Sequence, residues 1–337
     1  MTMIKLNCSY IIKMGAVSLS AALLIISCTE ELPMISSDIP VAFAPASDWN
    51  DLLPVTRADA TGFETGATIG VFGYYLPGET TDVSNKTPDF MYNEEVTKQA
   101  DDSWTYSPLK YWPADQSDKI HFVGYTPMAS ASNRISISSN TQKGYPILSY
   151  TLGDARTDLL ASVPVSANKE NDPVILEFQH ILGQVNVKLK AADDFKWLDD
   201  ENIQITSVTL KSVNGQGSFD FIKWTTSGPT DLIISSGSSF SKSTNSGNIL
   251  NGFPVHLLPT SLSELQIVVK TTINGTPITE TINCSLETDL SVIPGKNHII
   301  TIILNRDMTG LSAKADWIRS DSQEVIFDGN EINHHKN

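Results

Sequence analysis

The chain has 337 residues, with 38 acidic and 23 basic side chains and a formal net charge of −15. This balance argues against nucleic acid or anionic lipid as a partner bound by charge, because both are negative as well. The length is enough for two domains, and three cysteines are too few for a scaffold held by several disulfides. We therefore expect a fold that depends on a hydrophobic core.

The N-terminus has the pattern of a secretory signal. Two lysines, Lys5 and Lys13, precede an uncharged run at residues 15–26. That run is too short to cross a bilayer as a helix, and its length is typical of the apolar core of a signal peptide. We expect residues 1–27 to be removed, which would leave 310 residues with a charge of −17.

The apolar run ends in the letters IISC, and this motif resembles a bacterial lipobox. The resemblance implies that a signal peptidase cuts between Ser27 and Cys28 and that lipid is attached to the sulfur of Cys28. The alternative is an ordinary signal peptide with an incidental cysteine. Of the other cysteines, Cys8 leaves with the signal, and Cys284 then has no partner. Cys284 is expected to be a small strand residue rather than a nucleophile.

The rest of the chain predicts strands. After residue 27 no stretch has the length and apolar character of a membrane-spanning helix. Short segments alternate apolar and polar residues and are rich in β-branched side chains, which predicts half-buried strands. The simplest architecture is all-β, with two β-sandwiches in tandem. The clearest segments are residues 38–46, 68–76, 119–125, 173–178, 183–190, 203–213, 265–273 and 299–304.

Turns and loops are expected where Gly, Pro, Asn and Ser gather. Turn-forming residues predict turns at 77–79, 214–217, 274–276 and 294–296. Residues 235–248 are rich in Ser and Gly, and they predict a flexible surface loop.

A domain boundary is expected near residues 161–173, which are rich in Ser, Pro, Asn and charge. It would separate an N-terminal sandwich at residues 58–172 from a C-terminal sandwich at residues 173–337.

No arrangement of side chains predicts catalysis, a metal site or a bound cofactor. The histidines lack HExxH spacing, and neither a phosphate-binding glycine loop nor a G-x-S-x-G elbow is present. His121 and His180 lie inside expected strands, Asp199 and Asp200 predict a turn, and residues 328–335 predict a solvated tail rather than a metal site. We therefore expect that the protein is not an enzyme.

Aromatic residues are concentrated in one part of the chain. They fall mostly in alternating segments, which favours a sandwich core over an exposed carbohydrate-binding platform. They are Phe72, Tyr74, Tyr75, Phe90, Tyr92, Trp104, Tyr106, Tyr111, Trp112, Phe122 and Tyr125.

An ordered set of motifs resembles the fimbrillin family, whose members are subunits of type V pili in anaerobic Gram-negative bacteria. The combination of YSPLKYWP with LEFQH is specific to this family. The motifs are TGATIGVFGYYLPG (65–78), PDFMYNEEVT (88–97), SWTYSPLKYWPADQSDKIHFVGYTP (103–127), TDLLASV (157–163), VILEFQHILGQVNVKLK (174–190) and VIPGKNHIITIIL (292–304), followed by Trp317.

The resemblance implies two β-sandwich domains of transthyretin-like topology. It also implies structural roles for Trp112, Pro113 and His180. The expected function is that of a structural pilus subunit that serves in cell adhesion, located in a fimbria on the cell surface. Its expected partners are other fimbrial subunits, and the lipid on Cys28 would attach the precursor to the outer membrane.

Members of this family are processed by an Arg-specific protease, which removes the lipidated N-terminal segment. The candidate bond here is Arg57–Ala58, because Arg57 is the only basic residue between Cys28 and Lys86. The Pro, Thr, Asp and Gly residues around it predict an exposed, irregular segment, as cleavage requires. Residues 28–57 would then be a propeptide. A solvated loop arginine is the alternative.

The propeptide contains an expected edge strand at residues 38–46, with Ile39, Val41 and Phe43 on one face and Pro40 indicating a sheet edge. Its release would expose unpaired backbone groups, which a strand from another subunit could cover.

In this family the donor strand comes from the C-terminal part of a neighbouring subunit. The candidate in this chain is residues 322–332, with Val325 and Phe327 on one face.

Two other functions stay open. One is a tip adhesin or a surface lipoprotein that binds a glycan or protein ligand on host or bacterial cells. The other is an anchor subunit that keeps its lipid and is not cleaved, and the letters TRA at residues 56–58 argue mildly against it.

Overall fold

The structure is a computed structural model that describes residues 36–47, 62–78, 82–198, 201–244, 247–273, 276–306 and 311–319. Strands dominate this part of the chain, and the only helices in it are two short 3-10 turns, η1 (Lys169–Asn171) and η2 (Lys242–Thr244). No helix in the described residues is long and apolar enough to cross a membrane. The prediction of an all-β fold is confirmed.

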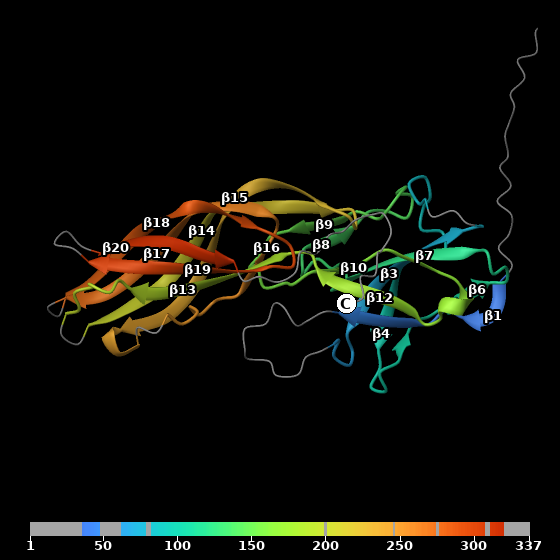
Figure 1. The fold of residues 1–337 in the computed structure, drawn as a ribbon, viewed down its shortest axis with the longest axis horizontal. Helices are drawn as coiled ribbons and strands as arrows, with labels where there is room; N and C mark the ends of the chain where they lie inside the picture. The colour runs from blue at the N-terminus through green and yellow to red at the C-terminus, as the bar shows by residue number, and fades with distance from the viewer. Residues whose placement is uncertain are drawn as a thin grey trace, which may run out of the picture. The chain divides into compact units, whose positions relative to one another are not determined.

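An eight-stranded sheet is built from the first half of the described chain (Figure 1). Its order is β2-β12-β10-β7-β3-β4-β5, and β11 also pairs with β7. The strands are β2 (Phe43–Ser47), β3 (Thr68–Leu76), β4 (Met91–Lys98), β5 (Trp104–Thr105), β7 (Lys119–Thr126), β10 (Leu160–Ser162), β11 (Val165–Ala167) and β12 (Val174–His180). A separate two-stranded sheet joins β1 (Ser36–Pro40) to β6 (Tyr111–Pro113).

A ten-stranded sheet follows the order β16-β13-β19-β20-β18-β17-β14-β9-β8, and β15 pairs with β14. Its strands are β8 (Ile135–Ile137), β9 (Leu148–Thr151), β13 (Gly183–Ala191), β14 (Asn202–Phe219), β15 (Trp224–Ser241), β16 (Val255–Leu257), β17 (Thr260–Ile273), β18 (Thr276–Val292), β19 (Asn297–Arg306) and β20 (Leu311–Arg319).

The chain does not pass from one sheet to the other at a single point. β8 and β9 join the ten-stranded sheet, although they precede β10 and β12 of the eight-stranded sheet. All described residues belong to one compact unit. The domain limits at residues 58–172 and 173–337 stay predictions, as does the transthyretin-like topology.

The eight-stranded sheet is buried on both faces at β3 and β7. Ile69 and Phe122 belong to one hydrophobic cluster, whereas Tyr74 and Tyr125 belong to the other. Alternate residues of a strand point to opposite faces, so a strand buried on both sides needs apolar residues at nearly every position. This explains the almost continuous burial along β3, where the sequence predicts a half-buried strand.

The aromatic residues form core, as their alternation predicts. Phe72, Tyr74, Trp112, Phe122 and Tyr125 have no exposed surface. Of the same group, Tyr92 and Tyr111 are partly exposed, at 37% and 41%. The aromatic set is therefore mainly a packing feature of the eight-stranded sheet and its neighbours.

Two predictions about loops are wrong. The expected turn at residues 214–217 lies inside β14, where Gly217 has no room for a side chain, since a Cβ there would lie 2.7 Å from Leu258 Cδ2. The expected flexible loop at residues 235–248 includes the end of β15, because Phe240 packs into the core. Glycine allows close packing at the first site. At the second site, Ser235 and Ser239 occupy exposed positions of a strand.

Cys284 is a fully buried residue of β18. Burial raises the pKa of its thiol to about 12, so the reactive thiolate is disfavoured. The prediction of a small strand residue is confirmed.

His121 is a core histidine of β7. Its Nδ1 lies 2.7 Å from Ser166 Oγ and its Nε2 lies 2.9 Å from Tyr145 Oη. The side chain is 7% exposed, and burial lowers its pKa to about 4. The folded protein therefore holds this ring neutral at neutral pH.

We expect His121 to lower the free energy of unfolding as the pH decreases. Between its unfolded pKa of about 6.5 and its folded pKa, the unfolded chain binds the proton more readily, so stability falls as pH decreases. Measured by urea unfolding at pH 7 and pH 4, the parent chain should lose roughly 3 kcal/mol more than His121→Gln. An equal loss in both proteins would contradict this assignment.

Candidate functional site

The residues that the sequence singles out for processing and assembly are not among those the structure describes. Their assignments therefore stay predictions. The residues outside the described part of the chain are Ser27, Cys28, Arg57, Ala58, Val325 and Phe327. The structure does describe residues 36–47, which we call the N-terminal strand segment, and its contacts with the eight-stranded sheet.

The N-terminal strand segment is two strands rather than the single strand expected at residues 38–46. β1 pairs with β6, and β2 pairs with β12. Pro40 ends β1, since proline has no amide hydrogen with which to continue a ladder. Val41 and Phe43 are buried as expected, but the prediction for Ile39 is wrong, because its side chain is 46% exposed.

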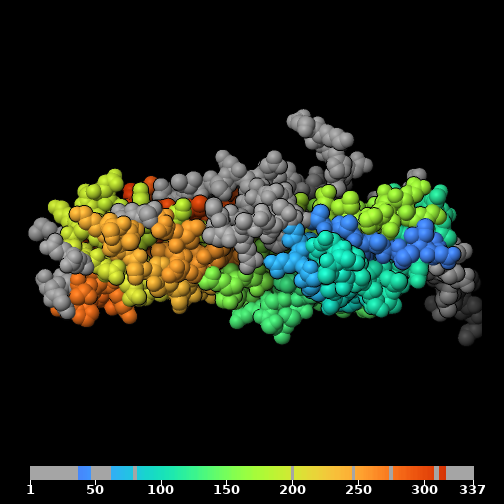
Figure 2. All heavy atoms as spheres, turned by 90° about the horizontal axis from the view of Figure 1, so that it is seen from below, coloured from blue at the N-terminus to red at the C-terminus, as the bar shows by residue number. Residues whose placement is uncertain are grey.

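β2 forms one edge of the eight-stranded sheet. It runs parallel to β12, with Phe43 opposite Val174 and Ser47 opposite Phe178. On its other side β12 is antiparallel to β10. In Figure 2 the blue N-terminal strand segment lies on the surface between cyan and yellow-green atoms. β2 is therefore an edge strand that lies on the surface of the molecule.

Between β1 and β2 the main chain of Val41 and Ala42 is held by four hydrogen bonds. The Val41 amide donates to the Lys110 carbonyl oxygen (2.9 Å), and the Val41 carbonyl accepts from Tyr106 Oη (2.8 Å). The Ala42 amide donates to Asp172 Oδ1 (2.8 Å), and its carbonyl accepts from the Val174 amide (2.8 Å).

These partner groups come from Tyr106, Lys110, Asp172 and Val174, and we call them the main-chain clamp. Their hydrogen bonds go only to backbone atoms of the strand they hold, so these bonds select an extended conformation rather than particular side chains.

The packing of Val41 and Phe43 next to the clamp selects which side chains the site accepts. The Phe43 ring lies edge-on to Tyr106 and Phe122, with centroid distances of 5.6 and 5.4 Å. Phe43 and Val41 are 4% and 2% exposed, and burial of such side chains stabilises a fold by roughly 1.5–3 kcal/mol each. The site thus binds two apolar side chains that are two residues apart.

Asp172 connects the clamp to the core. Its Oδ1 accepts the Ala42 amide and also Trp112 Nε1 at 3.0 Å, and Trp112 is fully buried. The same carboxylate oxygen therefore orients a core tryptophan and one amide of the N-terminal strand segment. Burial raises the pKa of Tyr106 to about 12, which keeps its hydroxyl protonated as a donor to Val41.

Sequence reasoning located the strand but missed most of the clamp. Trp112 is structural, in agreement with the resemblance, but nothing in the pattern pointed to Asp172 or to the Lys110 carbonyl. Asp172 stands before Pro173 in a charged stretch that predicts a boundary loop. Its role depends on Trp112, 60 residues away in the chain.

His180 is also structural. It is 8% exposed, and its Nδ1 lies 2.8 Å from Asp158 Oδ2. His256 is near the same carboxylate oxygen, at 4.0 Å. Within the described residues, no group of three or more His, Cys, Asp or Glu side chains has an arrangement that could hold a metal ion.

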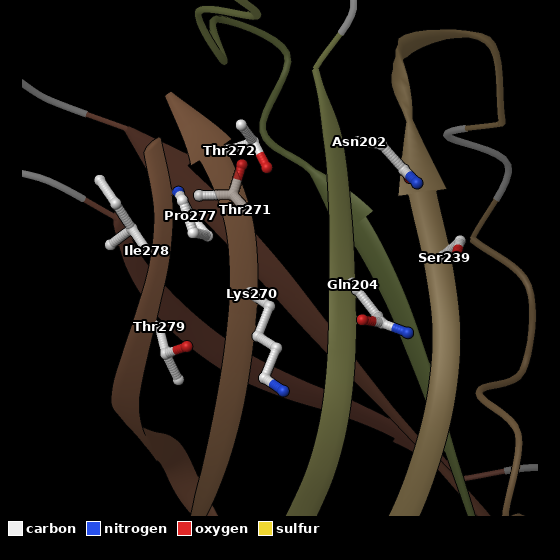
Figure 3. A pocket seen from close by; sticks show the side chains of 9 residues that line it. All are labelled: Asn202, Gln204, Ser239, Lys270, Thr271, Thr272, Pro277, Ile278 and Thr279. Atoms are coloured by element: carbon white, nitrogen blue, oxygen red, sulfur yellow. The ribbon is translucent and has the colours of Figure 1, made fainter. Parts of the chain in front are cut away.

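A second surface feature is a polar hollow of about 590 Å³ over β14, β15, β17 and β18 (Figure 3). Amide, hydroxyl and ammonium groups line it, from Asn202, Gln204, Ser239, Lys270, Thr271, Thr272 and Thr279, together with Pro277 and Ile278.

We expect Tyr106→Phe to destabilise the uncut protein by about 1–3 kcal/mol, because the buried Val41 carbonyl loses its donor. Tyr92→Phe is the matched control, since its hydroxyl bonds the Ser138 carbonyl at an exposed position. That variant should change stability by less than about 0.5 kcal/mol. Urea unfolding measures both, and equal losses would show that the clamp is not a buried contact.

Comparison with known proteins places the chain in a family. The family model for fimbrillin-like proteins matches residues 56–317. Fimbrium subunit Fim1C of Phocaeicola vulgatus is 30% identical over 173 residues, which are 46% of this chain and 45% of that relative's length.

A crystal structure of a fimbrial protein from Bacteroides vulgatus has the same fold, with a TM-score of 0.56 and 21% identity over 74% of this chain and 92% of that one. The chain belongs to the fimbrillin-like family.

Proposed function

We propose that this protein is a structural subunit of a fimbria, a type V pilus, which polymerises with other subunits and serves in cell adhesion at the cell surface. One observation carries the proposal beyond family membership. The N-terminal strand segment precedes Arg57, and its strand β2 forms the edge of the eight-stranded sheet as the outer neighbour of β12. A subunit with a removable edge strand has the architecture that strand exchange requires.

The proposed route begins with export as a lipoprotein. Signal peptidase cuts before Cys28, and lipid on that cysteine holds the precursor at the outer membrane. An Arg-specific protease then cuts the Arg57–Ala58 bond. The residues from Cys28 to Arg57 are no longer connected to the subunit, and they include β1 and β2.

Loss of the segment creates an adhesive edge. β12 loses its parallel neighbour, and the pocket that held Phe43 is left open beside Tyr106 and Phe122. Unpaired backbone groups on a sheet edge accept another strand. Residues 322–332 of a neighbouring subunit, with Val325 and Phe327 on one face, are the proposed donor. Such a head-to-tail contact does not close on itself, so it produces a fibre.

A tip adhesin is the second candidate function, and the polar hollow of Figure 3 favours it. Its amides, hydroxyls and the Lys270 ammonium are groups that hydrogen-bond the hydroxyls of a glycan. Immunogold labelling of fibres separates the two roles, because a stalk subunit is labelled along the fibre and a tip subunit only at its end.

We expect low-dose trypsin to convert the purified precursor into SDS-resistant ladders, and Arg57→Ala to abolish them, because the N-terminal strand segment stays attached. Arg57→Lys is the matched control. Trypsin cuts it, so ladders should form, whereas an Arg-specific protease should leave it monomeric. If Arg57→Ala forms ladders as well as the parent chain, the proposed mechanism is wrong.

A further inference from the structure

We propose that the main-chain clamp stays in place after cleavage and, together with the buried positions of Val41 and Phe43, sets the register of the incoming strand, so that residues 325–327 of a second copy take the positions of residues 41–43. This inference rests on the proposed strand exchange. It adds the alignment of the donor, which neither the family nor the fold assigns.

The clamp survives cleavage because all of its groups lie after Arg57 in the chain. Tyr106 Oη and the Val174 amide remain as donors, and the Lys110 carbonyl and Asp172 Oδ1 remain as acceptors. Without the N-terminal strand segment these groups lose partners at 2.8–2.9 Å. Any extended chain can replace those bonds, since they involve only main-chain atoms of the strand that is held.

Side chains then decide which residues enter. The positions of Val41 and Phe43 are buried, whereas Ala42 between them is half-buried. The replacing strand therefore needs apolar residues two apart, with a large one at the second position. In residues 320–337 the apolar side chains are those of Val325, Ile326, Phe327 and Ile332.

For a strand that runs in the same direction as β2, one register satisfies both buried positions. With Val325 at position 41, Phe327 takes position 43, and the residue types of the N-terminal strand segment are repeated. A shift of one residue places either Glu324 or Asp328 in a buried position, which is costly for an unpaired charge. A shift of two places Gln323 or Gly329 there, which buries an amide or leaves the aromatic pocket empty.

This register predicts a neighbour across the new ladder. Ala44 faces Ile175 in the uncut chain, and Ile175 is 57% exposed. In the assembled fibre Asp328 of the second copy should therefore face Ile175. Ile175 points away from the core, so an engineered disulfide at this position would not disturb the core.

The test uses cysteine pairs in the full chain, read by mass spectrometry of disulfide-linked peptides. The pair A44C with I175C should cross-link in the uncut precursor, which calibrates the geometry. After cleavage, I175C with D328C should cross-link between subunits. I175C with I326C and I175C with N330C are matched controls, displaced by two residues on the same face and too distant for a disulfide. Cys284 is buried and does not compete.

A second arm tests the clamp itself. Asp172→Ala removes an acceptor for the incoming strand, and Asp172→Asn keeps a side-chain oxygen at the same place. We expect Asp172→Ala to slow assembly of the cleaved subunit by about tenfold or more, and Asp172→Asn to restore most of the rate. Equal rates in the parent and Asp172→Ala would show that the clamp does not act on the donor.

The outcomes separate this inference from the proposed function. If ladders form and the cross-links appear at I326C or N330C, strand exchange is supported but the proposed register is wrong. Ladders without any cross-link would show that residues 325–327 are not the occupant. If no cleaved protein forms ladders, the proposed function itself fails.

Discussion

The proposed function depends on the pairing between β2 and β12. β2 precedes the proposed cleavage point at Arg57, whereas β12 lies well after it in the chain, so the two strands of one ladder can be separated by one cut. While the chain is intact, β12 is paired on both sides and the aromatic pocket is filled by Phe43. In the proposed route the precursor would thereby keep this sheet edge covered until it is cut.

Removal of an edge strand is compatible with a stable sheet because the centre of that sheet is held from both faces. β3 and β7 contribute Ile69 and Phe122 to one hydrophobic cluster and Tyr74 and Tyr125 to the other. The cluster that contains Tyr125 does not include Val41 or Phe43. Loss of the N-terminal strand segment, as proposed, would therefore open one side of the structure while the other side remained packed.

Much of the fold could be predicted from the sequence, because period-two alternation directly reflects a strand with one buried face. The segment at residues 68–76 coincides with β3, and the segment at residues 183–190 lies within β13. The alternation pattern did not predict strands where small residues lie inside them for close packing. Gly217 sits inside β14 for close packing, although glycine more often indicates a turn.

The site was harder to predict than the fold. The buried positions of Val41 and Phe43 follow from alternation, but the hydrogen bonds around them do not. Any residue has a backbone carbonyl, so the sequence does not indicate that the Lys110 carbonyl accepts a hydrogen bond. Asp172 is held by Trp112, which is distant in sequence. The exposure of Ile39 was missed as well, because the chain changes sheets at Pro40 and the face of β1 is no longer that of β2.

Hydrogen–deuterium exchange of the β12 amides shows whether the N-terminal strand segment is the removable edge of this sheet. It can be measured in the uncut chain, in the chain cut at Arg57 before assembly, and in the polymer. We predict slow exchange at residues 174–178 in the uncut chain, fast exchange after the cut, and slow exchange again in the fibre. Exchange that is unchanged by the cut would contradict it.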